Sequence, residues 1–228
     1  MKGICFAVSV GPGDPGLMTI GAARCIERCP VVAAPRTGGE RQLALSIAAG
    51  AVDLTGKEML PLPLKMSRDR AQTARGYELA AAALARHLAA GRDVALLTLG
   101  DASLYATAGY LLPRVRRAGY ETRVLPGVPS FCAGAARVGA PLAEREHPLR
   151  ILPATAPDLA DELRRDGGKV ILKAAGAAFH RARAAIEQAG LTGRATVVEN
   201  ATLPDERVTP LAAYTGAPGY FTMILVEG

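Results

Sequence analysis

Short apolar runs alternate with amphipathic stretches through the first half of the chain. The β-rich or continuously apolar runs predict buried strands at residues 3–10, 30–34, 92–99 and 121–125. Apolar side chains at helical spacing predict helices at residues 18–29, 69–90 and 104–118, the last with a kink at Pro113. Because strands alternate with helices and are apolar along their length, we expect a mostly parallel sheet with both faces covered.

A second set of elements begins after Pro126-Gly127. The same patterns predict helices at residues 130–138, 158–165 and 177–189. Strands are predicted at residues 149–152, 169–174, 195–199 and 220–226. No sequence repeat with a fixed period is present. We therefore expect an α/β protein made of two α/β domains, an N-terminal domain of residues 1–127 and a C-terminal domain of residues 128–228.

The composition is that of a globular protein, and its charge suggests an anionic partner. Half of the 228 residues are hydrophobic, and the net charge is +6. A basic balance favours a nucleic acid, a membrane surface or a polyanionic small molecule, although arginines scattered over a solvated surface would give the same charge. The chain has no dense run of Lys or Arg, no Trp and only 4% aromatic residues. These features argue against a nucleic acid and favour a polycarboxylate small molecule.

Membrane-spanning and targeting signals are not found in the sequence. The longest apolar runs, such as residues 94–99, have the length of a strand, whereas a spanning helix needs roughly 20 apolar residues. The apolar run at the N-terminus lacks a small-residue cleavage site and is interrupted by GPGDP at residues 11–15. We expect a cytoplasmic protein with no membrane partner.

The four cysteines and three histidines do not have the spacing of a metal site. Cys25 and Cys29 lie four residues apart, as two ligands on one helix face could, but they share an apolar stripe with Met18, Ala22 and Ile26. Reduced thiols that pack in a core explain this stripe, so we expect no metal.

Residues 11–16, GPGDPG, match the GxGxxG pattern between an expected strand and an expected helix. An NADP-binding oxidoreductase is therefore an alternative function, with Arg36 placed to bind a 2′-phosphate. Pro12 weakens this alternative, because a proline offers no amide to a pyrophosphate and stiffens the turn.

Two further loops follow expected strands. Residues 97–105, LTLGDASLY, place Gly100 and Asp101 at the carboxyl end of a buried strand, where α/β sheets bind ligands. Gly100 would let a ligand approach the backbone. Asp101 would either cap the next helix or accept hydrogen bonds from a ligand. Residues 126–131, PGVPSF, offer helix-start amides and a hydroxyl that suit a carboxylate.

The order of GPGDP, LTLGDASLY and PGVPSF resembles the tetrapyrrole (corrin/porphyrin) methyltransferase family. More narrowly, PGVPSFCAGAARVGAPLAE and the later ILPA, VILKA and VVENATLPDERV resemble the members that methylate carbon 20 of precorrin-2. The resemblance covers essentially the whole chain. It implies a homodimer, a tetrapyrrole as methyl acceptor, and S-adenosylmethionine held between two α/β domains. A family member that acts at another ring carbon or on another acceptor is the alternative within the family.

The resemblance also implies the residues that bind the cofactor, largely through backbone groups. They are Pro12, Gly100, Asp101, Leu104, Tyr105, Ser130, Phe131, Lys173, Ala174, Asn200 and Ala201. The chain departs from the family pattern at Ala102, where Pro is frequent, and at Pro129, where Ser is more usual. These departures bear on substrate affinity more than on cofactor binding.

A polycarboxylate substrate needs cationic partners. We expect Arg36 and Arg68 to bind substrate carboxylates, because arginine suits bidentate contacts. Further candidates for this role are Lys65, Arg145 and Arg207. Methyl transfer from a sulfonium mainly requires alignment, so neither a metal nor a covalent intermediate is expected. A base that removes a proton is not identified by the sequence, and the candidates are Tyr105, Tyr110, Glu144 and Glu146.

Overall fold

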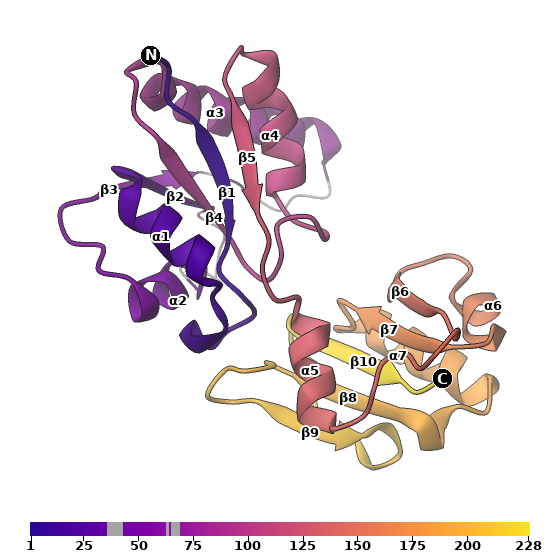
Figure 1. Ribbon diagram of the computed structural model, residues 1–228. Helices are drawn as coiled ribbons and strands as arrows, with labels where there is room; N and C mark the ends of the chain where they lie inside the picture. The colour runs from indigo at the N-terminus through magenta and orange to yellow at the C-terminus, as the bar shows by residue number, and fades with distance from the viewer. Residues whose placement is uncertain (36–42, 63, 65–68) are drawn as a thin grey trace. The chain divides into compact units, whose positions relative to one another are not determined.

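The computed structural model divides into two compact units, Met1–Pro129 (unit 1) and Ser130–Gly228 (unit 2). The structure describes all residues except 36–42, 63 and 65–68. Each unit contains one five-stranded sheet, as Figure 1 shows.

The sheet of unit 1 is parallel, with the strand order β3-β2-β4-β1-β5. Its strands are β1 (Cys5–Ser9), β2 (Val31–Pro35), β3 (Glu58–Leu62), β4 (Val94–Thr98) and β5 (Thr122–Leu125). The central strands β1 and β4 are buried along their whole length. The parallel sheet expected from the apolar runs is therefore confirmed for this unit.

Helices cover both faces of the unit 1 sheet. They are α1 (Ile20–Arg28), α2 (Leu43–Ala51), α3 (Arg70–Ala89) and α4 (Ala108–Arg117). Side chains of β1 alternate between two cores, so that Cys5 and Ala7 pack with α3 and α4, whereas Phe6 and Val8 pack with α1 and α2. Both faces are thus dry, which explains why the strands read as continuous apolar runs.

The cysteine stripe of α1 is part of the core. Cys25 and Cys29 are each 1% exposed and pack with Ile26 on one face of the sheet. Cys5 is also buried, whereas Cys132 is exposed. The interpretation of Cys25 and Cys29 as core residues is confirmed.

Unit 2 has a mixed sheet with the strand order β6-β7-β10-β8-β9. Its strands are β6 (Leu149–Pro153), β7 (Gly168–Leu172), β8 (Ala195–Glu199), β9 (Arg207–Pro210) and β10 (Thr222–Val226). Its helices are α5 (Ser130–Val138), α6 (Leu159–Arg164) and α7 (Ala177–Gln188). β6 and β7 are parallel, but β10 runs antiparallel to both β7 and β8. The parallel arrangement therefore does not extend to this unit.

Three elements were missed by the sequence patterns. α2 is apolar on most sides and so lacks helical periodicity. β3 contains Pro61 and lies at the sheet edge, where a proline is tolerated. β9 is largely exposed at the edge of its own sheet.

One expected helix starts later than predicted. α4 begins at Ala108, not at Leu104, and continues through Pro113. Tyr105 has a φ of 50°, a left-handed conformation that cannot belong to a right-handed helix. The residues before Ala108 therefore form a connection at the end of β4.

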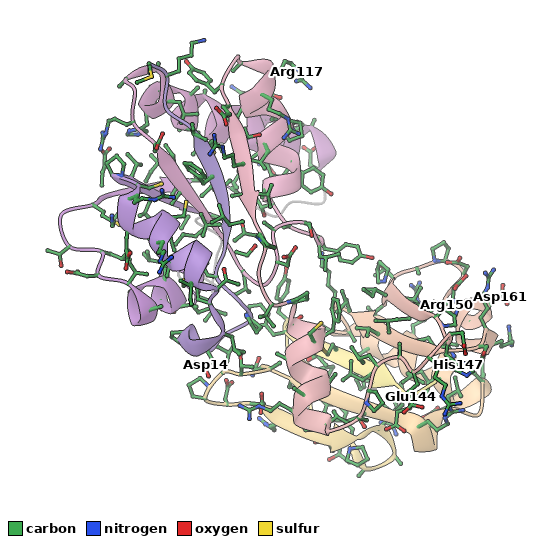
Figure 2. All side chains as sticks on the ribbon, in the orientation of Figure 1. Asp14, Arg117, Glu144, His147, Arg150 and Asp161 are labelled. Atoms are coloured by element: carbon green, nitrogen blue, oxygen red, sulfur yellow. The ribbon has the colours of Figure 1, made fainter. Side chains whose placement is uncertain are left out.

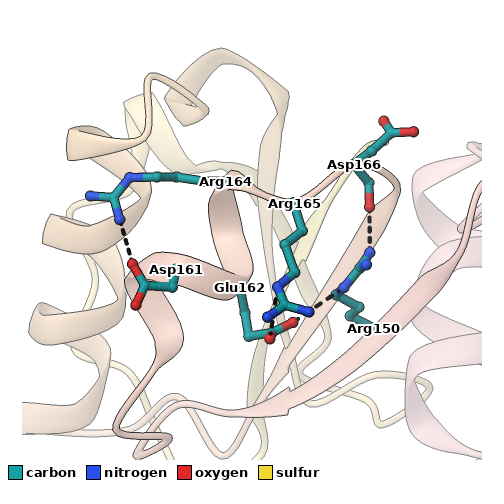
Figure 3. Close-up of polar contacts among 6 residues, drawn as sticks. All are labelled: Arg150, Asp161, Glu162, Arg164, Arg165 and Asp166. Carbon is teal, nitrogen blue, oxygen red and sulfur yellow. Dashed lines mark hydrogen bonds and ion pairs between the residues drawn. The ribbon is translucent and has the colours of Figure 1, made fainter.

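Charged side chains fasten α6 to the start of β6 (Figure 3). Glu162 pairs with Arg150 at 3.2 Å and with Arg165 at 3.1 Å. Arg150 also donates to the backbone carbonyl of Asp166. This cluster lies where β6 and β7 begin, at the opposite end of the sheet from Lys173, the residue that follows β7.

Gly168, the first residue of β7, packs directly on backbone. A Cβ at this position would lie 2.0 Å from the carbonyl oxygen of Leu142. We expect Gly168→Ala to lower the free energy of unfolding by about 2 kcal/mol, because the backbone must shift to admit the methyl group. Urea unfolding followed by circular dichroism measures the change. Gly193→Ala is the control, since its Cβ would meet open space; equal midpoints for the two variants would contradict the expectation.

Candidate functional site

The connections that follow β1, β4 and β5 leave the unit 1 sheet at the edge formed by the carboxyl ends of its strands. We call them loop 1 (residues 10–19), loop 2 (residues 99–107) and loop 3 (residues 126–129), which follow β1, β4 and β5. Because β1 lies between β4 and β5, the three loops are neighbours (Figure 1). The carboxyl ends of parallel strands are where open α/β sheets bind ligands.

Loops 1 and 2 are joined by a backbone bridge. The amide of Gly100 donates to the carbonyl of Gly11 at 2.7 Å, and the amide of Gly11 donates to the carbonyl of Gly100 at 3.3 Å. Gly11 and Gly100 have φ values of 81° and 69°, which favour glycine. This bridge is antiparallel, unlike the parallel pairing of β1 with β4, so it is a separate connection between the two loops.

Asp101 fastens loop 2 to loop 3. Its carboxylate accepts hydrogen bonds from the amide of Gly127 at 2.7 Å, from the amide of Ser103 at 2.8 Å, and from the Ser103 hydroxyl. Burial opposes ionisation of Asp101, but these hydrogen bonds outweigh it and hold its pKa below the usual range. Of the two roles expected for Asp101, capping of the next helix is wrong, because α4 begins only at Ala108.

Loop 1 does not have the geometry of a dinucleotide loop. The amide of Gly16 donates to the side chain of Asp14 at 2.8 Å, and the amide of Leu17 donates to its carbonyl at 3.0 Å. A short 3₁₀ turn follows, and α1 starts at Ile20 with Thr19 as its cap. The GxGxxG match therefore does not open directly onto a helix N-terminus, as pyrophosphate binding requires. Figure 2 labels Asp14 in this loop.

The expected cofactor residues of unit 1 all lie in loops 1 and 2. Pro12 and Gly100 are buried, whereas Leu104 and Tyr105 are 38% and 53% exposed. The left-handed backbone of Tyr105 carries a conformational cost that is common at functional sites. Loop 2 is thus held by hydrogen bonds at Gly100 and Asp101 and is exposed at Leu104 and Tyr105.

A second group of expected cofactor residues meets at one edge of the unit 2 sheet. The amide of Ala174, beyond β7, donates to the carbonyl of Thr222 at 3.0 Å. The amide of Asn200, beyond β8, donates to the carbonyl of Phe221 at 3.2 Å. The ends of β7 and β8 therefore flank the start of β10, and the structure brings Ala174 and Asn200 to the same edge.

The backbone at this edge of unit 2 is strained. Lys173, Asn200 and Thr202 have φ values of 57°, 51° and 67°. For side chains other than Gly, Asn and Asp this left-handed region is uncommon, and each instance costs on the order of 1–3 kcal/mol. Lys173 and Thr202 are such residues, and they lie beyond the ends of β7 and β8, on the two sides of β10, which marks the edge as a candidate ligand site.

Polar groups that the sequence patterns did not single out lie beside this edge. The hydroxyl of Tyr214 donates to Glu199 at 3.0 Å, and burial together with that carboxylate raises the pKa of Tyr214 to about 12. Among the described residues, the Thr222 hydroxyl is buried without a hydrogen-bond partner. Glu199 and Thr222 are polar residues at the ends of otherwise apolar strands. This pattern is the sequence signal that could have identified them as candidate site residues.

The remaining cofactor expectations fall on the start of α5 and the residue after Asn200. Phe131 is 6% exposed and packs with Ala201 in the core of unit 2. Ser130 is the first residue of α5 and is half-buried. The Phe131 ring therefore supports α5 from inside the unit, which leaves backbone groups for any ligand contact.

The expected substrate residues Arg36 and Arg68 lie outside the described residues, as does Lys65. Arg145 and Arg207 are exposed in unit 2. Arg145 precedes β6 and Arg207 begins β9, and these are the two outer strands of the unit 2 sheet.

The candidate bases belong to different elements, with Tyr105 in loop 2, Tyr110 in α4, and Glu144 and Glu146 between α5 and β6. Tyr110 stacks on Tyr77, with ring centroids 5.1 Å apart. Glu144, labelled in Figure 2, and Glu146 are exposed in unit 2.

Within the described part of the chain, no three His, Cys, Asp or Glu side chains gather as a metal site would require. Among the described helices, none combines the length and apolarity that crossing a bilayer requires.

A family model for tetrapyrrole (corrin/porphyrin) methylases matches residues 5–214. The chain belongs to this family. The match includes all three loops of unit 1 and the ends of β7 and β8 in unit 2. The motif order GPGDP, LTLGDASLY and PGVPSF was thus a correct indication of the tetrapyrrole methylases.

Two relatives are similar over most of their length. A cobalt-precorrin-2 C(20)-methyltransferase of Salmonella typhimurium is 38% identical over 91% of this chain and 87% of the relative. A precorrin-2 C(20)-methyltransferase of Sinorhizobium sp is 31% identical over 99% of this chain and 96% of the relative.

Solved structures of tetrapyrrole methylases share the fold. A cobalt precorrin-4 methyltransferase has a TM-score of 0.75 at 20% identity, covering 98% of this chain and 94% of that one. A uroporphyrin-III C-methyltransferase from Thermus thermophilus, complexed with S-adenosylhomocysteine, has a TM-score of 0.68 at 24% identity, covering 99% of this chain and 98% of that one. The α/β fold class is confirmed.

Removal of the Asp101 charge should separate loops 2 and 3. We expect Asp101→Asn to lower the free energy of unfolding at pH 7 by about 2 kcal/mol, because two amides lose a charged acceptor. The folded pKa of Asp101 is depressed, so its contribution is present above the unfolded pKa and disappears as pH falls through the folded pKa.

Chemical unfolding of Asp101→Asn and of the parent protein at pH 7 and near pH 3 tests this dependence. The difference in stability should shrink at the lower pH. The control is Glu121→Gln, which removes a surface ion pair with Arg123 and should change stability little. A difference for Asp101→Asn that does not vary with pH would contradict the role of the ionised carboxylate.

Proposed function

We propose that the protein transfers a methyl group from S-adenosylmethionine to carbon 20 of precorrin-2, or of its cobalt complex, in cobalamin biosynthesis. The observation that carries the proposal is near full-length similarity to two C(20)-methyltransferases, one named for each of these acceptors. The two relatives are named for the same ring carbon but for acceptors with and without cobalt, so both acceptors have to be compared by experiment.

Bound S-adenosylmethionine would supply a methyl group that its sulfonium already activates. A carbon–carbon bond would form as the carbon–sulfur bond breaks, the electron pair would stay on sulfur, and the proton lost from the acceptor carbon would pass to a base or to water. In such a displacement the protein contributes mainly by holding donor and acceptor in line. Loops that are fixed before the ligand arrives suit this task, and loops 1, 2 and 3 are fastened through Gly11, Gly100 and Asp101.

We assign cofactor binding to the loops of unit 1 and to the strained edge of unit 2. Gly100, Ala174 and Ala201 are small, so no long side chain would separate a ligand from the chain at these places. Leu104 and Tyr105 add exposed apolar surface suited to an adenosine or methionine group. The proposed set also includes Pro12, Asp101, Ser130, Phe131, Lys173 and Asn200. We further propose a cytoplasmic homodimer.

The product of the reaction tests the proposal. Purified protein is incubated anaerobically with methyl-labelled S-adenosylmethionine and either precorrin-2 or its cobalt complex. Mass spectrometry and NMR should show one labelled methyl group at carbon 20, and the better acceptor identifies the pathway. A methyl group at another carbon would move the enzyme to another branch of the tetrapyrrole methylases. No methylation of either acceptor would overturn the proposal.

Arg36 and Arg68 are proposed to bind substrate carboxylates, because arginine suits bidentate contacts. Reversal of charge in Arg36→Glu or Arg68→Glu should raise the KM for the tetrapyrrole by about tenfold or more, the effect of losing a charge-assisted hydrogen bond. The KM for S-adenosylmethionine should stay within about twofold. Arg117→Glu, at the exposed end of α4 (Figure 2), is the matched control. An unchanged tetrapyrrole KM in both variants would refute the assignment.

A further inference from the structure

Ser9 is a fully buried residue with a hydroxyl side chain at the end of β1 in unit 1. The other residues of β1 are apolar, and Ser9 is 0% exposed. Pairing of β1 with β5 ends at Val8 and Leu125, and pairing with β4 ends at Ser9 and Thr98. Ser9 therefore stands where both neighbouring strands leave the sheet.

The Ser9 hydroxyl connects β5 and loop 2 at the point where strand pairing with β1 ends. It donates to the carbonyl of Leu125 at 2.7 Å, at the end of β5, and accepts from the amide of Ala102 at 2.9 Å, in loop 2. One hydroxyl thus serves as donor to one neighbour and acceptor from the other. An alanine at this position would leave a carbonyl and an amide without that partner.

Ser9 also determines how closely loop 3 approaches. A Cβ added to Gly127 would lie 2.4 Å from the Cβ of Ser9, so the backbone of Gly127 rests directly on the serine side chain. Gly127 in turn donates to Asp101. Gly127 therefore packs on Ser9 and on the carbonyl oxygen of Gly100, and its amide is bound to the Asp101 carboxylate.

We propose that Ser9 is a positioning residue for the methyl donor. By holding loops 2 and 3 at fixed distances from β1, it keeps the cofactor-binding backbone groups in place before the ligand arrives and raises affinity without touching the ligand. This inference rests on the proposed function. Affinity rises in this way because loops that are already ordered lose less conformational entropy when the ligand binds.

A purely structural serine would affect stability and not affinity, so the test measures both. S-adenosylhomocysteine is titrated calorimetrically into the full-length protein, Ser9→Ala and Val115→Ala, and thermal unfolding is recorded for each. Val115 is buried in α4 and takes no part in the loop contacts, so its truncation supplies a comparable loss of stability. We expect a rise of about tenfold in Kd for Ser9→Ala, equivalent to about 1.4 kcal/mol, and a Kd within about twofold of the parent for Val115→Ala.

Ser9→Cys is a second variant that keeps the test decisive if Ser9→Ala does not fold. The thiol keeps a side chain at this position but is a weaker donor and acceptor. We expect its Kd to rise by about threefold, with faster hydrogen exchange at the Ala102 and Gly127 amides.

The outcomes separate the two proposals. Binding by the parent protein with an unchanged Kd in both Ser9→Ala and Ser9→Cys would overturn the role of Ser9 alone. An equal loss of affinity in Val115→Ala at matched stability would do the same. Failure of the parent protein to bind S-adenosylhomocysteine would overturn the proposed function and, with it, the inference about Ser9.

Discussion

Backbone amides and carbonyls lose their ladder partners where β1, β4 and β5 end, and a buried group of this kind has to find another partner. The carboxyl edge of unit 1 is organised by that requirement. Gly11 and Gly100 pair with each other, and Asp101 accepts from Gly127 in the neighbouring loop. Because protein groups meet these needs, the three loops are joined to one another through their own backbone and side-chain groups. An edge of this kind suits a reaction that depends on alignment more than on acid or base strength.

The two units solve the same backbone problem with different residues. In unit 1 the left-handed turns next to the strand ends fall on Gly11 and Gly100, which adopt them without strain. In unit 2 they fall on Lys173, Asn200 and Thr202, of which only Asn tolerates the conformation readily. A glycine would relieve the strain at Lys173 or Thr202 but would remove the side chain.

Local pattern explains which parts of the fold were predictable. β1 and β4 are continuous apolar runs because both faces of the sheet are covered, and α1 and α3 have apolar residues at helical spacing because one stripe of each helix is buried. α2 and β9 lack such spacing, so no local signal marked them. The motif order identified the family, but the partners of Asp101 depend on β1 lying between β4 and β5, which is a property of topology. Arg36 and Arg68 stay predictions for the same reason, since their role depends on what lies near them in space.

The distribution of thiols allows α5 to be labelled selectively at Cys132. Three of the four cysteines are inside unit 1, and burial raises the pKa of Cys5 to about 12, so its thiolate is scarce at neutral pH. Cys132 is exposed on α5, next to Phe131, with a pKa that partial burial raises. A maleimide or spin-label reagent should therefore attach at one position, slowly at neutral pH and faster in mild alkali. The native chain, without any engineered cysteine, can thus carry a single spectroscopic reporter two residues beyond the junction with loop 3.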